Sequence, residues 1–60
     1  MNFREVDKIL KADGWTLKSV KGSHHNYVHP TKPGKVTVPR HSGDIPPIVV
    51  KCILTQAQLL

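Results

Sequence analysis

Apolar residues recur with the period of a helix in the N-terminal part of this chain. The positions between them are mostly charged, so the pattern predicts an amphipathic helix over residues 3–12. Asn2 followed by Glu5 matches a capping box at the start of this helix, and Gly14 is a suitable left-handed stop after its end. The apolar stripe consists of Phe3, Val6, Ile9 and Leu10.

From Trp15 onward the apolar period shortens to two, which predicts strands. The three stretches are residues 15–20, 24 or 25 to 29, and 35–39. Their connections are short and rich in glycine or proline, so we expect an antiparallel meander. Five side chains are expected to face the core: Trp15, Leu17, Tyr27, Val36 and Val38. The opposite face should then carry Thr16, Lys18, His24, Asn26, Val28, Lys35 and Thr37.

The C-terminal apolar run predicts a second helix over residues 46–58. Asp44 can cap it, because the two following prolines are tolerated only in a first turn. Its buried stripe should be Ile45, Val49, Cys52 and Ile53, which makes Cys52 a core residue rather than a nucleophile. The predicted fold is α+β, in the order α-β-β-β-α. A three-stranded antiparallel sheet carries both helices on one face, as in double-stranded-RNA-binding domains, and one domain spans residues 1–60.

The length and the net charge of the chain narrow the classes of molecule that it is expected to bind. Sixty residues bury only about 60% of the unfolded surface, so stability should be marginal and a bound partner is plausible. The net charge of +5 suggests a polyanion, with nucleic acid as the main expectation. One cysteine, no membrane-length apolar run and no signal peptide favour a cytoplasmic protein with no membrane partner.

Candidate chemistry is concentrated in residues 21–30, which hold three of the four histidines. His24 lies where a glycine-serine turn enters a strand, and histidine exchanges protons near neutral pH. The stretch is either a site of proton transfer or a solvent-facing strand that is rich in histidine. A zinc site would need His24 or His25 with His29 and His41, but alternate strand positions seldom converge on one ion, so no metal is expected.

The motifs together resemble those of the HicA family of toxins, small bacterial mRNA interferases that pair with a HicB antitoxin. The resemblance covers nearly the whole chain. It is carried by Asp13-Gly14-Trp15, Gly22-Ser23-His24-His25, His29-Pro30, Val36-Thr37-Val38-Pro39-x-His41 and Lys51-x-Ile53-Leu54. Two departures fall on the second helix: Pro47-Ile48-Val49 stands where the family often has Gly-Thr, and Ala57-Gln58-Leu59 where it usually has Ala-Gly-Leu.

The resemblance implies that His24 is catalytic, with His25 as the alternative because some members carry the histidine one place later. It also implies cleavage of mRNA and neutralisation by a HicB-like antitoxin. Because the residues offer no set of metal ligands and the ribose 2′-hydroxyl can serve as the nucleophile, cleavage is expected to need no metal and no small-molecule cofactor. Whether His25, His29 or His41 assists is left open. The residues expected to contact RNA are Lys18, Lys21, Gly22, Ser23, Lys35 and Arg40. The alternatives are a non-catalytic RNA-binding module and an interaction protein with an acidic partner.

Overall fold

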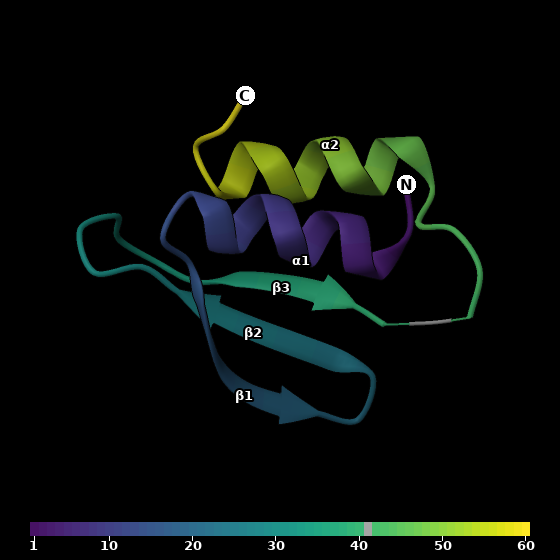
Figure 1. The fold of residues 1–60 in the computed structure, drawn as a ribbon, viewed down its shortest axis with the longest axis horizontal. Coiled ribbons are helices and arrows are strands. Elements are labelled where there is room, and N and C mark those ends of the chain that lie inside the picture. Colours follow the sequence, from purple (N-terminus) through teal and green to yellow (C-terminus); the bar gives the residue numbers. More distant parts are fainter. Residues whose placement is uncertain (41) are drawn as a thin grey trace.

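The structure is a computed structural model that describes residues 1–40 and 42–60. The three strands form one antiparallel sheet in the order β1-β2-β3. Figure 1 shows both helices on one side of the sheet, with β1 at the edge that is farther from α2. This arrangement confirms the predicted fold class. The elements are α1 (Phe3–Ala12), β1 (Thr16–Lys21), β2 (His24–Val28), β3 (Val36–Pro39) and α2 (Pro47–Gln56).

The core lies between the sheet and the two helices. Tyr27, Val36 and Val38 are fully buried, which confirms the predicted direction of β2 and β3. The hydroxyl of Tyr27 donates a 2.5 Å hydrogen bond to Asp7 Oδ1 on α1, so the most central strand is tied to the helix above it. The buried apolar residues are Val6, Leu10, Trp15, Tyr27, Val36, Val38, Ile45, Val50, Ile53 and Ala57.

Both helices end in a Schellman motif, in which two backbone amides beyond the helix bond back to its last turn. At the end of α1, Trp15 N bonds to Leu10 O at 3.0 Å, and Gly14 has a φ of 103°. At the end of α2, Leu59 N bonds to Leu54 O at 2.8 Å. Gln58 occupies the left-handed position there with a φ of 60°, a position that glycine usually takes.

The expectation for Leu17 was wrong, because 43% of its surface is exposed. Alternation does turn Leu17 to the side of Tyr27, with which it pairs. However, β1 is an edge strand, and all of its residues are exposed. The apolar alternation of β1 predicted the side of the sheet to which Leu17 points. Whether Leu17 is buried depends on whether a helix covers that edge of the sheet.

Two details of α2 also differ from the expectation. Its N-cap is Pro46 and has no side-chain hydrogen bond, while Asp44 forms an isolated bridge with Asn2 instead. Cys52 is exposed rather than buried. Ile45 and Ile53 of the predicted stripe are buried, and Val49 is partly buried against the core. Val50 and Ala57 complete the buried side of the helix in place of Cys52.

Within the described part of the chain, no helix combines the length and the apolar character needed to cross a membrane.

Candidate nucleic-acid interface

A two-residue turn positions His24 at one end of the sheet. Lys21 ends β1 and pairs directly with His24, which begins β2, so only Gly22 and Ser23 connect the strands. Gly22 has a φ of 61°, as the first central residue of a tight hairpin turn requires, and a Cβ there would meet nothing within 4 Å. The carbonyl of Ser23 accepts a 2.7 Å hydrogen bond from the amide of Arg40, which fixes the turn against the end of β3.

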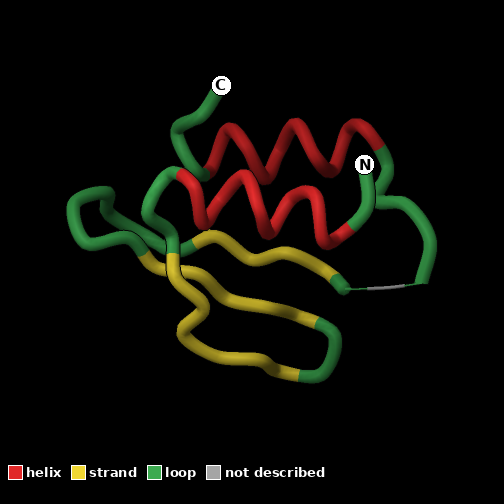
Figure 2. The backbone as a smooth tube through the Cα atoms, in the orientation of Figure 1, coloured by secondary structure: helices red, strands yellow, loops and turns green. Residues whose placement is uncertain are grey.

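The sheet side that faces away from the helices is called here the open face. His24 is exposed on it. Figure 2 shows the β1–β2 turn and the β2–β3 loop at opposite ends of the sheet, so His24 stands at the turn end of this face. From the strand register and the lining of the hollow, the open face comprises Thr16, Lys18, Ser19, Lys21, His24, Asn26, Val28, Lys35, Thr37 and Pro39.

A β-bulge at Lys18 determines which residues of β1 reach the open face. Leu17 pairs with Tyr27 and Ser19 pairs with the adjacent Asn26, so Lys18 is an extra residue on β1. Strict alternation beyond Lys18 would have turned Lys21 toward the helix side. The bulge resets the alternation, and Lys21 therefore stands beside His24 on the same face.

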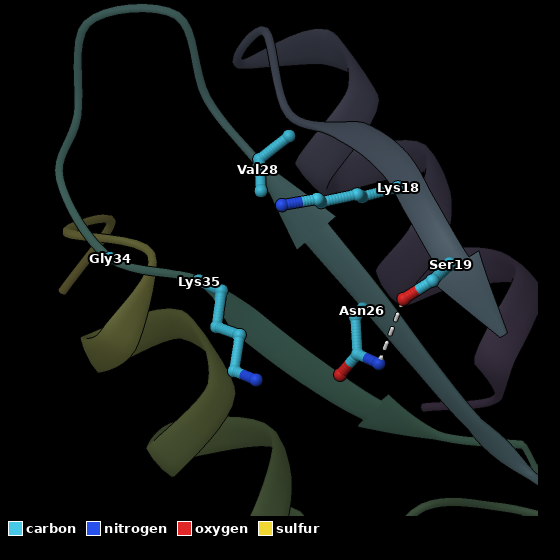
Figure 3. Close-up of a pocket in the computed structure, with 6 residues that line it drawn as sticks. All are labelled: Lys18, Ser19, Asn26, Val28, Gly34 and Lys35. Atoms are coloured by element: carbon cyan, nitrogen blue, oxygen red, sulfur yellow. Dashed lines mark hydrogen bonds between the residues drawn. The ribbon is translucent and has the colours of Figure 1, made fainter. Parts of the chain in front are cut away.

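A chain of hydrogen bonds crosses the open face next to His24. Thr37 Oγ1 donates to Asn26 Oδ1 at 2.8 Å, and Asn26 Nδ2 donates to Ser19 Oγ at 3.2 Å. The three residues lie on β3, β2 and β1, so the amide of Asn26 is held from both sides. This amide lies in a shallow hollow of about 370 Å³. Figure 3 shows it among the residues that line the hollow. The lining residues are Lys18, Ser19, Asn26, Val28, Gly34 and Lys35.

The charge on the open face has one sign. Lys18, Lys21 and Lys35 belong to it, and none of the four acidic residues of the chain does. Each acidic residue lies on the helix side or in a loop. Glu5 completes the α1 capping box, Asp7 bonds Tyr27 and Lys11, and Asp13 bonds Lys32. Asp44 lies in the loop before α2, where its backbone bridges to Asn2. The open face is therefore suited to a polyanion.

His25 and Arg40 lie on the other side of the sheet. The ring of His25 is 4.7 Å from the ring of Phe3, centroid to centroid. The guanidinium of Arg40 lies 5.0 Å above the same phenyl ring. Their side chains therefore pack beside α1, and His24 is the histidine of the Gly-Ser-His-His motif that faces the open face.

His29 joins three segments of the fold. Its Nδ1 accepts hydrogen bonds from the amides of Thr31 and Lys32, both at 3.1 Å, so Nε2 carries the proton and donates to Asp13 O at 2.6 Å. The side chain is only 9% exposed and packs edge-on against Trp15. These contacts give His29 a structural role that accounts for the Asp13-Gly14-Trp15 and His29-Pro30 motifs.

The pKa shifts of three groups have their causes on the helix side. Burial raises the pKa of Tyr27, and the hydrogen bond to Asp7 raises it further. Burial alone would raise the pKa of Asp7, but the hydrogen bond from Tyr27 and the charge of Lys11 outweigh it, so this pKa is lowered. The pKa of Asp13 is lowered chiefly by Lys32, whose Nζ lies 2.5 Å from its carboxylate.

Several predicted site residues are brought together by the fold, and others are separated. Lys18, Lys21 and Lys35 share the open face with His24. Gly22 and Ser23 form the adjoining turn, whereas the Arg40 side chain packs on Phe3. His41 lies outside the described residues. Among residues 1–40 and 42–60, no three histidine, cysteine or acidic side chains lie close enough together to hold a metal ion.

Ser19 and Asn26 were not among the predicted RNA-contacting residues, although they form the centre of the open face. The direction of Asn26 followed from placing Tyr27 inward. Ser19 could not be found in this way, because strict alternation turns it toward the helices and only the bulge reverses it. A bulge is difficult to predict from sequence. The one indication here is that Ser19 is polar at a position where strict alternation predicts an apolar, helix-facing residue.

Comparison with known proteins gives one match that covers almost the whole chain. The family model described as HicA toxin of bacterial toxin–antitoxin matches residues 3–59. No curated protein matches the chain. The matched region includes α1, the whole sheet, α2 and every residue of the open face.

Proposed function

The chain belongs to the HicA family of toxins of bacterial toxin–antitoxin systems, and we propose that it is a metal-independent endoribonuclease that cleaves mRNA with His24 as its catalytic residue. The observation that carries this proposal is the position of His24. It is exposed on a sheet face that has lysines and no carboxylate, directly opposite Lys21. The other histidines of the described chain are engaged on the helix side or in structural hydrogen bonds.

The reaction requires few groups, because RNA carries its own nucleophile. The ribose 2′-oxygen forms a bond to the neighbouring phosphorus, and the bond from phosphorus to the 5′-oxygen breaks. One group takes the 2′-hydroxyl proton and another protonates the leaving 5′-oxygen. His24 serves one of these roles, an effect of about 10²–10⁴-fold, and water or a second group serves the other. The products are a 2′,3′-cyclic phosphate and a free 5′-hydroxyl.

Positive charge near the scissile phosphate stabilises the additional negative charge of the transition state. Lys21 is the nearest candidate, since it is paired with His24 across the hairpin. Gly22 and Ser23 can approach a phosphate through the backbone and hydroxyl of the turn. Lys18 and Lys35 are proposed to hold the flanking backbone. Arg40 is still a predicted RNA contact, but its guanidinium stacks on Phe3 and would have to move to reach the RNA.

Purified protein incubated with end-labelled RNA in EDTA tests the proposed activity. The expected result is fragmentation that survives chelation and yields 2′,3′-cyclic ends. A single 2′-deoxy nucleotide at the cleaved position should block that cut, because it removes the nucleophile. Activity that is lost on chelation and restored by zinc would contradict the metal-independent mechanism. Tight binding without fragmentation would indicate a non-catalytic RNA-binding module instead.

Membership in this family implies an antitoxin partner. We propose that the partner is an acidic, HicB-like protein that lies across the open face and covers His24. The site is a shallow surface rather than a deep pocket, so a protein can cover it where a small inhibitor finds little to bind. Carboxylates of the antitoxin would meet Lys18, Lys21 and Lys35 and speed association. Binding would also stabilise a small fold by mass action.

Competition between RNA and antitoxin tests this mode of inhibition. The His24→Ala variant is mixed with labelled RNA, so that the RNA survives, and the antitoxin is then added to saturation. We expect the RNA to be released and the melting temperature of the toxin to rise. A stable complex of all three components would show that the antitoxin acts elsewhere, and occlusion of His24 would have to be abandoned.

A further inference from the structure

The hollow beside His24 has the composition of a backbone-binding subsite. Lys18 enters it from the bulge of β1 and Lys35 from the segment before β3, on either side of β2 (Figure 3). Asn26 lies on β2, the strand between them, and is held by Ser19 and Thr37. Val28 adds an apolar surface to the lining. Two cations, an oriented amide and a small apolar patch match a phosphate with its ribose.

The amide of Asn26 retains unused bonding capacity. A side-chain amide offers two N–H donors and an acceptor oxygen with two lone pairs. One donor is used by Ser19 and one lone pair by Thr37, so one donor and one lone pair are available for a ligand. Because both neighbours fix the amide plane, little ordering entropy is lost when a ligand binds to it.

The dimensions of the face favour a single RNA strand. Three strands spaced about 4.8 Å apart give a face only about 10 Å across, which suits one strand better than a duplex. Asn26 is two residues beyond His24 on the same strand, and therefore about 6–7 Å away along β2. The edge of the hollow that is nearer to His24 is thus about one nucleotide of an extended strand away from it, and the hollow extends from there toward Val28.

We propose that this hollow is a subsite for one nucleotide that flanks the cleaved bond of a single-stranded RNA. Lys18 and Lys35 hold its phosphate oxygens, and the free N–H of Asn26 donates to the same backbone. Asn26 is a positioning residue, because it fixes the strand so that the next phosphate lies against His24. The position of this subsite relative to the cleaved bond rests on the proposed function, whereas the existence of the binding site does not.

The first experiment needs no cleavage. Binding of a single-stranded RNA is measured against salt concentration for the His24→Ala protein and for the same protein with Lys18→Ala and Lys35→Ala. Each phosphate neutralised on a single strand contributes about 0.7 to the slope of log affinity against log salt, and the two lysines hold the same phosphate, so the slope should fall by about 0.7. The matched control replaces Lys8 and Lys51, exposed lysines of the two helices, and should leave the slope unchanged. An equal fall in slope in the Lys18/Lys35 variant and in the Lys8/Lys51 variant would overturn the subsite.

The second experiment fixes the register. The substrate is a short 2′-O-methyl oligonucleotide with a single unmodified ribonucleotide, so only one bond can be cut. A neutral methylphosphonate is placed at each flanking linkage in turn, and single-turnover cleavage is measured. We expect one flanking position to slow cleavage about tenfold in the wild type and to have no further effect in the Lys18→Ala/Lys35→Ala variant. A loss that persists in that variant would refute the assignment.

Asn26→Asp tests the positioning role, since the two side chains have the same shape. The carboxylate still accepts from Thr37, but it faces the phosphate with negative charge. RNA binding should weaken at least tenfold at low salt, and melting temperature should be unchanged. Unaltered binding would refute the role of Asn26. Failure of the wild type to cut any RNA would instead refute the proposed function, while the salt slopes would still decide the subsite.

Discussion

The left-handed position after α1 gives a quantitative test of the packing around His29. Gly14 has a φ of 103°, and an added Cβ would lie 2.8 Å from His29 Nε2. That nitrogen donates the 2.6 Å hydrogen bond to Asp13 O. Gly14→Ala would therefore impose a backbone strain and displace a buried ring at the same time.

The expected loss is the sum of two contributions. A side chain at positive φ costs about 1–2 kcal/mol. Displacing His29 from its hydrogen bond costs about 1 kcal/mol more. The total of about 2–3 kcal/mol is a large share of the stability of a 60-residue domain, and it should lower the melting temperature by about 10–20 °C.

Thermal unfolding followed by circular dichroism measures this loss. Gly34→Ala is the matched control, because Gly34 has a φ of 80° and a Cβ there would meet nothing within 4 Å. It should show the strain alone, about 1–2 kcal/mol. Equal losses in the two variants would refute the contact with His29, and a loss below about 0.5 kcal/mol in both would refute the backbone conformation itself.

Three further predictions concern other parts of the chain. Gln58→Gly should raise the unfolding free energy by about 1 kcal/mol, because glycine adopts the left-handed position without strain; an unchanged melting temperature would contradict this. The pKa of Asp13 is lowered in the folded protein, so its ionised carboxylate stabilises the fold at pH values above 3.8, the ordinary pKa of this group. This contribution to stability is lost as the pH falls through the lower pKa of the folded state. Lys32→Met should therefore reduce the loss of stability between pH 7 and pH 3, whereas an unchanged loss would exclude the pairing. Cys52 should react with a thiol reagent in the folded protein, and protection until unfolding would show that it is buried.

The sequence predicted the fold well where local signals and burial agree. The α1 boundaries, the capping box and the inward direction of Tyr27 all follow from periodicity and from the larger apolar area that Tyr27 can bury. The predictions failed where an element lies at an edge. Leu17 has the right direction but no helix above it.

The residues of the candidate site could be named from the sequence, but their arrangement on the sheet could be predicted only in part. The glycine-serine turn gave His24 and its neighbours directly, because such turns have few conformations. The bulge at Lys18 could not be predicted, since it depends on how β1 pairs with β2. That single extra residue brings Ser19 and Lys21 to the open face and so creates the hollow and the charge beside His24.

The most direct test of the catalytic role of His24 compares two adjacent histidines that the sheet turns to opposite faces. Single-turnover cleavage of one labelled RNA is measured with the wild type, His24→Ala and His25→Ala, each shown to be folded by circular dichroism. If His24 is the catalytic residue, cleavage falls at least 100-fold in His24→Ala, as the loss of a general acid or base requires. His25→Ala, which removes a contact with Phe3, should retain cleavage and lose stability instead. An inactive His25→Ala beside an active, folded His24→Ala would contradict the assignment of the open face as the site of cleavage.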